Sequence, residues 1–197
     1  HVLTKPADLI IFTGDLADDL ACLKWLPETL GRLEARLGTY FVLGNHDWAL
    51  DPTRIRREMT QQGWTDVSGR TFTIELEGHR LTLGGDETPW IGQPPDFSSS
   101  PPEDYRLLVS HTPDHFARAQ REGVDLMLAG HVHGGQVVLP GVGPVYAPSR
   151  YGVRYAAGTF SKSPTVMHVS RGLAGCHPFR WRCPPEITWL VLERESA

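Results

Sequence analysis

The 197-residue sequence has few cysteines, no basic excess and no long apolar run. Its three cysteines, Cys22, Cys176 and Cys183, are too few for a disulfide framework, and one must stay unpaired in a monomer. The net charge of −4 lacks the basic excess of nucleic-acid-binding proteins, so we expect no nucleic-acid partner. No run is long enough to cross a bilayer and no signal peptide is visible. These absences favour a cytoplasmic protein; the spacing of Cys176 and Cys183 leaves their pairing open.

What is present is an ordinary globular composition, with 40% apolar and 21% charged residues. Short apolar runs bounded by Gly, Ser or Asp predict buried strands at residues 9–12, 40–43, 107–109 and 126–129. Alternating residues predict a hairpin over 71–85, and further extended runs fall at 136–139, 165–170 and 187–192. The Pro- and Ser-rich stretch 92–104 predicts a surface loop. The expected fold is α/β or α+β, with packed sheets covered by helices.

Three helical segments are expected between these strands. Leucines at helical spacing predict helices between Leu20 and Leu37, with Pro27 in the first turn of the second and Gly38 at its end. A helix over residues 53–62 follows Pro52. A third runs to about residue 122 from a cap at Asp114.

Polar side chains follow four of the predicted strands at the point where each strand ends. The residues of this kind are Asp15; Asn45, His46 and Asp47; His111; and His131 and His133. Because ligands bind at the carboxyl edge of α/β sheets, loops there bring distant residues together. Taken singly, Asp15 could cap a helix and Asn45 could belong to a turn. Their joint position at one sheet edge favours a shared site.

The residue types suit a transition-metal site. Imidazole, carboxylate and amide oxygen together suit Zn, Fe or Mn, and the absence of a neighbouring cysteine argues against a structural zinc site. Asp15 is the candidate for a carboxylate that bridges two ions. Two metal ions about 3.5–4 Å apart catalyse the hydrolysis of phosphate esters in many enzymes.

The motifs "GD", "GNHD", "SH" and "GHVHGGQ", in this order, resemble the calcineurin-like metallophosphoesterases over residues 7–193. The resemblance implies a four-layer fold, a two-sheet β-sandwich flanked by helices, in one domain over residues 1–197. It implies two divalent transition-metal ions (Mn, Zn or Fe), with Asp15 as the bridge. Asn45, His111 and His131 match ligands of one ion and His133 matches a ligand of the other. His46 matches the catalytic imidazole and Asp47 its orienting partner.

The family's opening D-x-H motif has no match here, and we expect it to lie upstream of residue 1. The expected activity is a phosphodiesterase or pyrophosphatase that activates water for attack on phosphorus. The alternative is a non-catalytic metal- or nucleotide-binding relative that lacks the first metal site.

The "GGQ" of residues 134–136 and the late "SRGLAG…CPPEI" resemble a bacterial branch with membrane-linked phosphoesterases and UDP-2,3-diacylglucosamine pyrophosphatases. A small phosphorylated substrate, such as a nucleotide-sugar lipid, and peripheral membrane association follow from this likeness. The substrate-binding residues and the oligomeric state stay open.

Several other residues have two interpretations. Trp48 and Trp90 could flank a substrate or serve packing, and Arg150 and Arg154 could hold a phosphate or lie on the surface. The remaining expectations are that Asp18 and Asp19 cap a helix and that Arg54, Arg56 and Arg57 form a solvated helix face.

Overall fold

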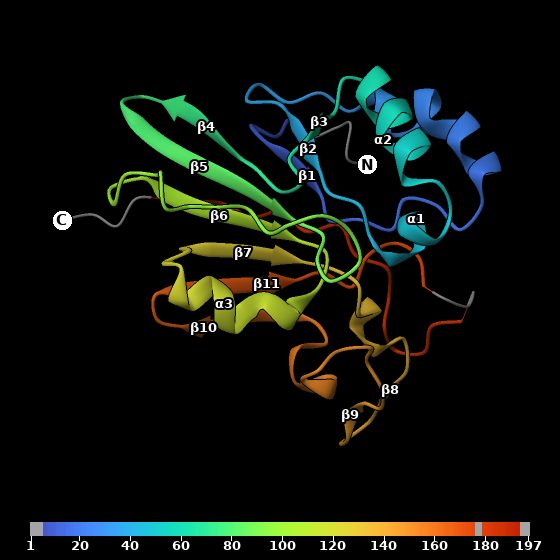
Figure 1. Cartoon of the computed structure of the whole chain (residues 1–197). Coiled ribbons are helices and arrows are strands. Elements are labelled where there is room, and N and C mark those ends of the chain that lie inside the picture. Colours follow the sequence, from blue (N-terminus) through green and yellow to red (C-terminus); the bar gives the residue numbers. More distant parts are fainter. Residues whose placement is uncertain (1–5, 176–178, 194–197) are drawn as a thin grey trace.

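The computed structural model describes residues 6–175 and 179–193 (Figure 1). A small parallel sheet has the order β1-β2-β3, and a larger mixed sheet has the order β10-β11-β7-β6-β5-β4. The strands of the small sheet are β1 (Ile10–Phe12), β2 (Thr39–Phe41) and β3 (Thr65–Asp66). Those of the large sheet are β4 (Thr71–Leu76), β5 (His79–Asp86), β6 (Tyr105–Ser110), β7 (Leu126–Ala129), β10 (Gly158–Lys162) and β11 (Thr165–Val169).

The two sheets pack face to face because their strands alternate between two apolar faces. In β6, Leu107 and Val109 face the layer between the sheets, whereas Leu108 faces the outer core under α3 (Phe116–Arg121). In the small sheet, Phe41 of β2 faces the outer helices, and its neighbour Val42 faces the larger sheet.

Helices cover both outer faces (Figure 1). The 3-10 helix η2 (Leu20–Glu28) and α2 (Pro52–Gln61) lie over the small sheet, and α3 lies over the large one. The expected two-sheet β-sandwich flanked by helices is therefore confirmed. Within the described residues, no helix is both long and apolar enough to cross a membrane.

The helix predictions are correct in position and partly wrong in type. The stretch after Asp19 forms η2 and the short 3-10 helix η3 (Leu30–Arg32), and Pro27 lies inside η2 rather than at a new start. Asp19 caps η2 as expected, through its contact with the N–H of Ala21.

The third helix begins differently from the prediction. The short 3-10 helix η4 (Pro113–His115) precedes α3, and its cap is Thr112. Asp114 instead accepts hydrogen bonds from the hydroxyl of Ser149 and the N–H of Arg150. Its carboxylate therefore ties a distant loop to this turn.

The strand predictions fail in part at residues 136–139 and fully at residues 187–192. Hairpin β4–β5 and strand β11 lie where the alternation predicts them. Of residues 136–139, only β8 (Val138–Leu139) is a strand, paired with β9 (Gly143–Pro144). Residues 187–192 form neither helix nor strand, because their apolar run finds no neighbouring strand among the described residues.

Candidate metal centre

The site lies at the carboxyl edge of both sheets, where β1, β2, β6 and β7 end. Loops after β1, β6 and β7 bring Asp15, His111 and His131 together, with one ligand atom of each within 4.8 Å of the others. Asp15 Oδ2 is 3.3 Å from His111 Nε2, and Asn45 Oδ1 is 3.1 Å from the same nitrogen. The structure therefore brings four of the five predicted metal ligands together, with Asp15, Asn45 and His131 around the imidazole of His111.

The buried polar atoms of this cluster fit a cation. His131 Nδ1 is buried and makes no hydrogen bond within the described part of the chain, and the buried Asp15 Oδ2 has only the ion-pair contact with His111 Nε2 at 3.3 Å. An unsatisfied buried acceptor is costly, so such atoms call for a partner that the fold itself does not supply. One carboxylate, one amide oxygen and two imidazoles form a donor set suited to a divalent transition metal.

Gly44 allows the cluster to be this tight. A Cβ on this residue would lie 2.1 Å from Asp15 Oδ1 and 2.5 Å from His111 Cε1. No side chain fits at those distances, so glycine is required where β2 leads into Asn45. The site is built by close backbone approach as well as by its ligands.

His133 is held separately from this cluster. In an extended segment, residues two apart such as His131 and His133 would point the same way. This segment is not extended, because His131 and His133 have positive φ (68° and 51°), and a 3-10 turn begins at His133. The left-handed backbone is strained for both residues.

The loop around His133 is fixed from the C-terminal side of the chain. The carbonyl oxygen of His133 accepts a hydrogen bond from Arg180 Nη1 at 3.2 Å. Cys183 is buried beside it, whereas Cys176, its candidate partner, lies outside the described residues. The turn after the second histidine is therefore held by a segment some fifty residues away in sequence.

The catalytic candidate His46 has a different partner from the one expected. Its ring Nδ1 lies 2.5 Å from a carboxylate oxygen of Asp18, and its backbone N–H donates to Asp15 Oδ1 at 3.0 Å. The prediction that Asp47 orients this ring, and that Asp18 caps a helix, is corrected: Asp18 takes the orienting place. The His46 side chain is 28% exposed, so it can reach a ligand.

Asp47 is fully buried and organises the backbone. One carboxylate oxygen accepts from the N–H groups of Leu16 and Ala17, at 2.9 and 3.2 Å, and the other accepts from Gly44 at 2.9 Å. These bonds tie the loop after β1 to the loop after β2. Burial raises the pKa of Asp47 to about 6, although the three donors act in the opposite direction.

Electrostatics favour a charged Asp15 and neutral imidazoles at His131 and His133. Burial acts to raise the pKa of Asp15, but hydrogen bonding and charge from His111 and His46 outweigh it and lower the pKa. Burial lowers the pKa of His131 to about 4, and it also lowers that of His133. A carboxylate beside neutral imidazoles is the protonation state that metal coordination requires.

Sequence reasoning missed the role of the turn after β5. The buried carboxylate of Glu87 accepts from the N–H of Leu43 and the hydroxyl of Ser68, both at 2.5 Å, and forms an ion pair with Arg56. Arg56 also contacts Asp66, so its assignment to a solvated face is wrong. The available signal was the "GGDETPW" stretch, which ends a strand at the same sheet edge.

Trp90 belongs to this turn and contacts two ligands. Its ring centroid lies 5.3 Å from that of His111 and 4.9 Å from that of His131. Arg150 and Arg154, by contrast, are exposed, and Arg154 lies over the ring of Tyr155.

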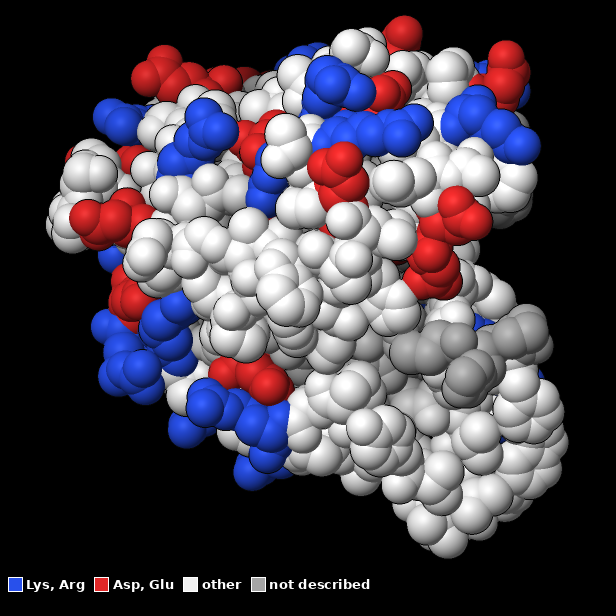
Figure 2. Space-filling view, turned by 45° about the vertical axis from the view of Figure 1, so that its right-hand side comes forward, with Lys and Arg blue, Asp and Glu red and all other residues white. Residues whose placement is uncertain are grey.

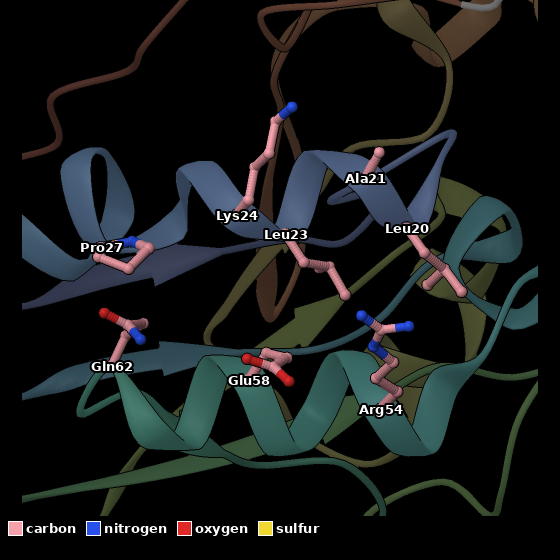
Figure 3. Close-up of a pocket in the computed structure, with 8 residues that line it drawn as sticks. All are labelled: Leu20, Ala21, Leu23, Lys24, Pro27, Arg54, Glu58 and Gln62. Carbon is pink, nitrogen blue, oxygen red and sulfur yellow. The ribbon is translucent and has the colours of Figure 1, made fainter.

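A groove of about 330 Å³ lies between η2 and α2, outside this cluster (Figure 3). Leu20 and Leu23 point from η2 toward Arg54 and Glu58 of α2. None of the ligand candidates lines this groove, so it belongs to the helix layer and not to the metal centre.

Comparison with known proteins agrees with this geometry. Residues 1–135 match the calcineurin-like phosphoesterase family, and the chain belongs to that family. It is therefore a metal-dependent phosphoesterase, a hydrolase that acts on a phosphorylated substrate with the help of divalent metal ions.

Two bacterial relatives resemble nearly the whole chain. The chain is 32% identical to the uncharacterized metallophosphoesterase YkuE of Bacillus subtilis, over 96% of this chain and 69% of that protein. It is also 32% identical to the phosphodiesterase YaeI of Escherichia coli, over 95% and 71%. A bovine transmembrane protein with metallophosphoesterase domain is 27% identical over 98% of this chain but 47% of its own length.

Proposed function

We propose that the chain is a phosphodiesterase with a dinuclear metal centre. The observation that supports this is the cluster of Asp15, His111 and His131, whose buried ligand atoms converge within 4.8 Å and include a His131 Nδ1 with no hydrogen bond among the described residues. The relative named a phosphodiesterase supports a diester substrate. Hydrolysis of a pyrophosphate bond, as in a nucleotide-sugar lipid, is the alternative that the same chemistry permits.

Asp15, Asn45, His111 and His131 would hold one ion, and His133 would serve the second, with Asp15 shared. Bound divalent ions supply charge neutralisation of the phosphoryl oxygens and lower the pKa of a water molecule. The chain's own contribution is a set of ligands held by buried backbone contacts before any ion arrives.

His46 would act on the leaving group. Its Nδ1 is engaged by Asp18, which leaves Nε2 to donate a proton to the ester oxygen as that oxygen departs. Asp18 holds the tautomer and orientation of the ring, as a carboxylate does in other imidazole pairs. The backbone bond from His46 to Asp15 couples the position of this acid to the metal ligand.

The test combines metal content with turnover. The protein is loaded with Mn²⁺ or Zn²⁺ and assayed on bis-p-nitrophenyl phosphate, p-nitrophenyl phosphate and UDP-glucose. We expect two ions per chain and preferential hydrolysis of the diester. His46→Asn should keep both ions and lose about 10²–10⁴-fold in kcat. A metal content near zero, or undiminished turnover in His46→Asn, would overturn the assignment.

A second proposal concerns location: the protein associates with membranes from the cytoplasmic side. Residues 126–149 contain no Lys, Arg, Asp or Glu, and Val142 and Tyr146 within them are 72% and 69% exposed. Figure 2 shows charged side chains over the upper part and the left side of the molecule, and few over the lobe at the lower right. Large exposed apolar patches mark interaction sites, and the bovine relative is named a transmembrane protein.

Sedimentation with phosphatidylglycerol vesicles tests this. Val142→Asp combined with Tyr146→Ser should abolish co-sedimentation and leave the hydrolysis of a soluble diester unchanged. Equal sedimentation of the variant and the unaltered protein would refute it.

A further inference from the structure

The turn after β5 carries a side chain that the proposed mechanism does not use. Trp90 lies against both His111 and His131, whose ring centroids are themselves 4.9 Å apart. The three rings therefore form one cluster, and the indole meets both imidazoles at steep interplanar angles of 71° and 56°. The contact with His111 is edge-to-face and the contact with His131 is tilted, and ring contacts of this kind are favourable and depend on orientation.

The backbone of the turn that carries Trp90 is held by polar contacts. The N–H groups of Trp90 and Ile91 both donate to the carbonyl oxygen of Glu87 at 3.2 Å. The Glu87 carboxylate is in turn anchored to Leu43 and Arg56, as described above. The turn that presents the indole is therefore tied to the strand that leads into Asn45.

The same turn is held on its two flanks. Asp86, at the end of β5, accepts the backbone N–H of His111 at 3.1 Å, so it also fixes the chain that carries a ligand. Its carboxylate accepts from the N–H and hydroxyl of Thr88. Ile91, on the other side, packs into the core beneath the small sheet. The backbone that carries Trp90 is therefore anchored on both sides, and the indole itself contacts the rings of His111 and His131.

We propose that Trp90 is a positioning residue of the metal centre, which fixes the ring orientations of His111 and His131 before an ion binds. Imidazole ligands coordinate only along a ring nitrogen's lone pair, so a ring free to rotate must lose that freedom on binding. Most metal-bound imidazoles are oriented by a hydrogen bond from the other ring nitrogen. His111 has such a partner in the carbonyl oxygen of Thr13 at 2.8 Å.

His131 differs in this respect. Within the described residues, neither nitrogen of its ring has a hydrogen-bond partner, and the buried Nδ1 is the atom that faces the cluster as a ligand. The packing of the indole therefore takes the place that a hydrogen bond holds for His111. We expect the effect of removing the indole to be largest at the ion that His131 serves.

The inference rests on the proposed metal centre, and Mn²⁺ binding to the full chain tests both separately. Equilibrium Mn²⁺ titrations followed by electron paramagnetic resonance are compared for the unaltered protein, Trp90→Ala, Trp90→Phe and the control Trp25→Phe. Trp25 is 57% exposed on η2, remote from the ligands in the fold. We expect Trp90→Ala to weaken binding of one Mn²⁺ about 10- to 100-fold, as loss of a supporting residue typically does.

Trp90→Phe keeps an aromatic ring at this position and should retain most of the Mn²⁺ affinity of the unaltered protein. Trp25→Phe should bind Mn²⁺ like the unaltered protein. Emission at position 90, taken as the difference between the unaltered protein and Trp90→Phe, should be quenched by Mn²⁺. Unfolding of the metal-free variants is measured alongside, so that weaker binding in a folded Trp90→Ala protein reports positioning.

Unchanged Mn²⁺ affinity in Trp90→Ala would overturn the inference and leave the metal centre intact. An affinity for Trp90→Phe as low as that of Trp90→Ala would also overturn it. Absence of Mn²⁺ binding in the unaltered protein would instead refute the proposed function on which the inference depends.

Discussion

The ion pair between Arg56 and Glu87 offers a prediction whose magnitude follows from burial. The Glu87 side chain is 2% exposed and the Arg56 side chain 23%. Arg56→Met removes the cation and leaves a buried carboxylate with only the hydrogen bonds from Leu43 and Ser68. Breaking such a buried pair costs about 3–5 kcal/mol. For a chain of this length, that loss lowers Tm by roughly 6–20 °C.

A double-mutant cycle in urea unfolding separates this cause from lost packing. Glu87→Gln removes the stranded charge and keeps an amide that can accept from Leu43. The double variant Arg56→Met/Glu87→Gln should therefore be more stable than Arg56→Met alone by about 1–3 kcal/mol. Arg57→Met, on the exposed side of the same helix, is the matched control and should stay within about 0.5 kcal/mol of the unaltered protein. Equal stability of Arg56→Met and the unaltered protein would refute the reasoning, as would a double variant no more stable than the single one.

Three further predictions concern the site itself. Asp47→Ala leaves three N–H groups in and around the core without their acceptor, which costs roughly 1–3 kcal/mol each, and the removal of a buried carboxylate offsets part of this cost. Urea unfolding should therefore show a marked loss of stability, and a neutral result would contradict the anchoring role of Asp47. His131→Ala and His133→Ala should lose different ions, and Asp15→Ala both, in anomalous diffraction; a shared ion for the two histidines would disprove the dinuclear assignment. Because burial lowers the pKa of His131 to about 4, the unfolded chain takes up a proton first as pH falls from about 6.5 to 4, and metal-free protein should lose up to about 1.4 kcal/mol per pH unit from this group. The loss should be smaller in His131→Ala, and an identical pH dependence in the two proteins would contradict it.

The local sequence determined the elements that bury an apolar face. The runs that form β1, β2, β6 and β7 are short, apolar and closed by Gly, Ser or Asp, which leaves a buried strand as the favoured conformation. Their order also determined which residues reach one edge, because parallel strands end on the same side. The convergence of Asp15, Asn45, His111 and His131 was predictable for that reason.

The partners within the site were not predictable, because they depend on how loops pack. Asp18 lies three residues after Asp15, and Asp47 directly follows His46. Sequence spacing alone cannot say which of the two carboxylates meets the His46 ring. The structure decides this by burying Asp47 among backbone N–H groups and leaving Asp18 beside the imidazole. The sequence around Arg56 likewise predicts an exposed helix residue, but in the structure Arg56 pairs with the buried carboxylate of Glu87.

The apolar run at residues 187–192 shows the limit most clearly. Its composition is that of a strand, but a strand exists only where a neighbour offers hydrogen-bonding groups in register, and none of the described strands does so for this segment. The conformation of His131 and His133 follows the same principle: both have a left-handed backbone, and the carbonyl oxygen of His133 is held by Arg180 from far along the chain. Periodicity along the chain thus determines which face a residue presents, whereas pairing and strain depend on atoms that only the tertiary structure brings near.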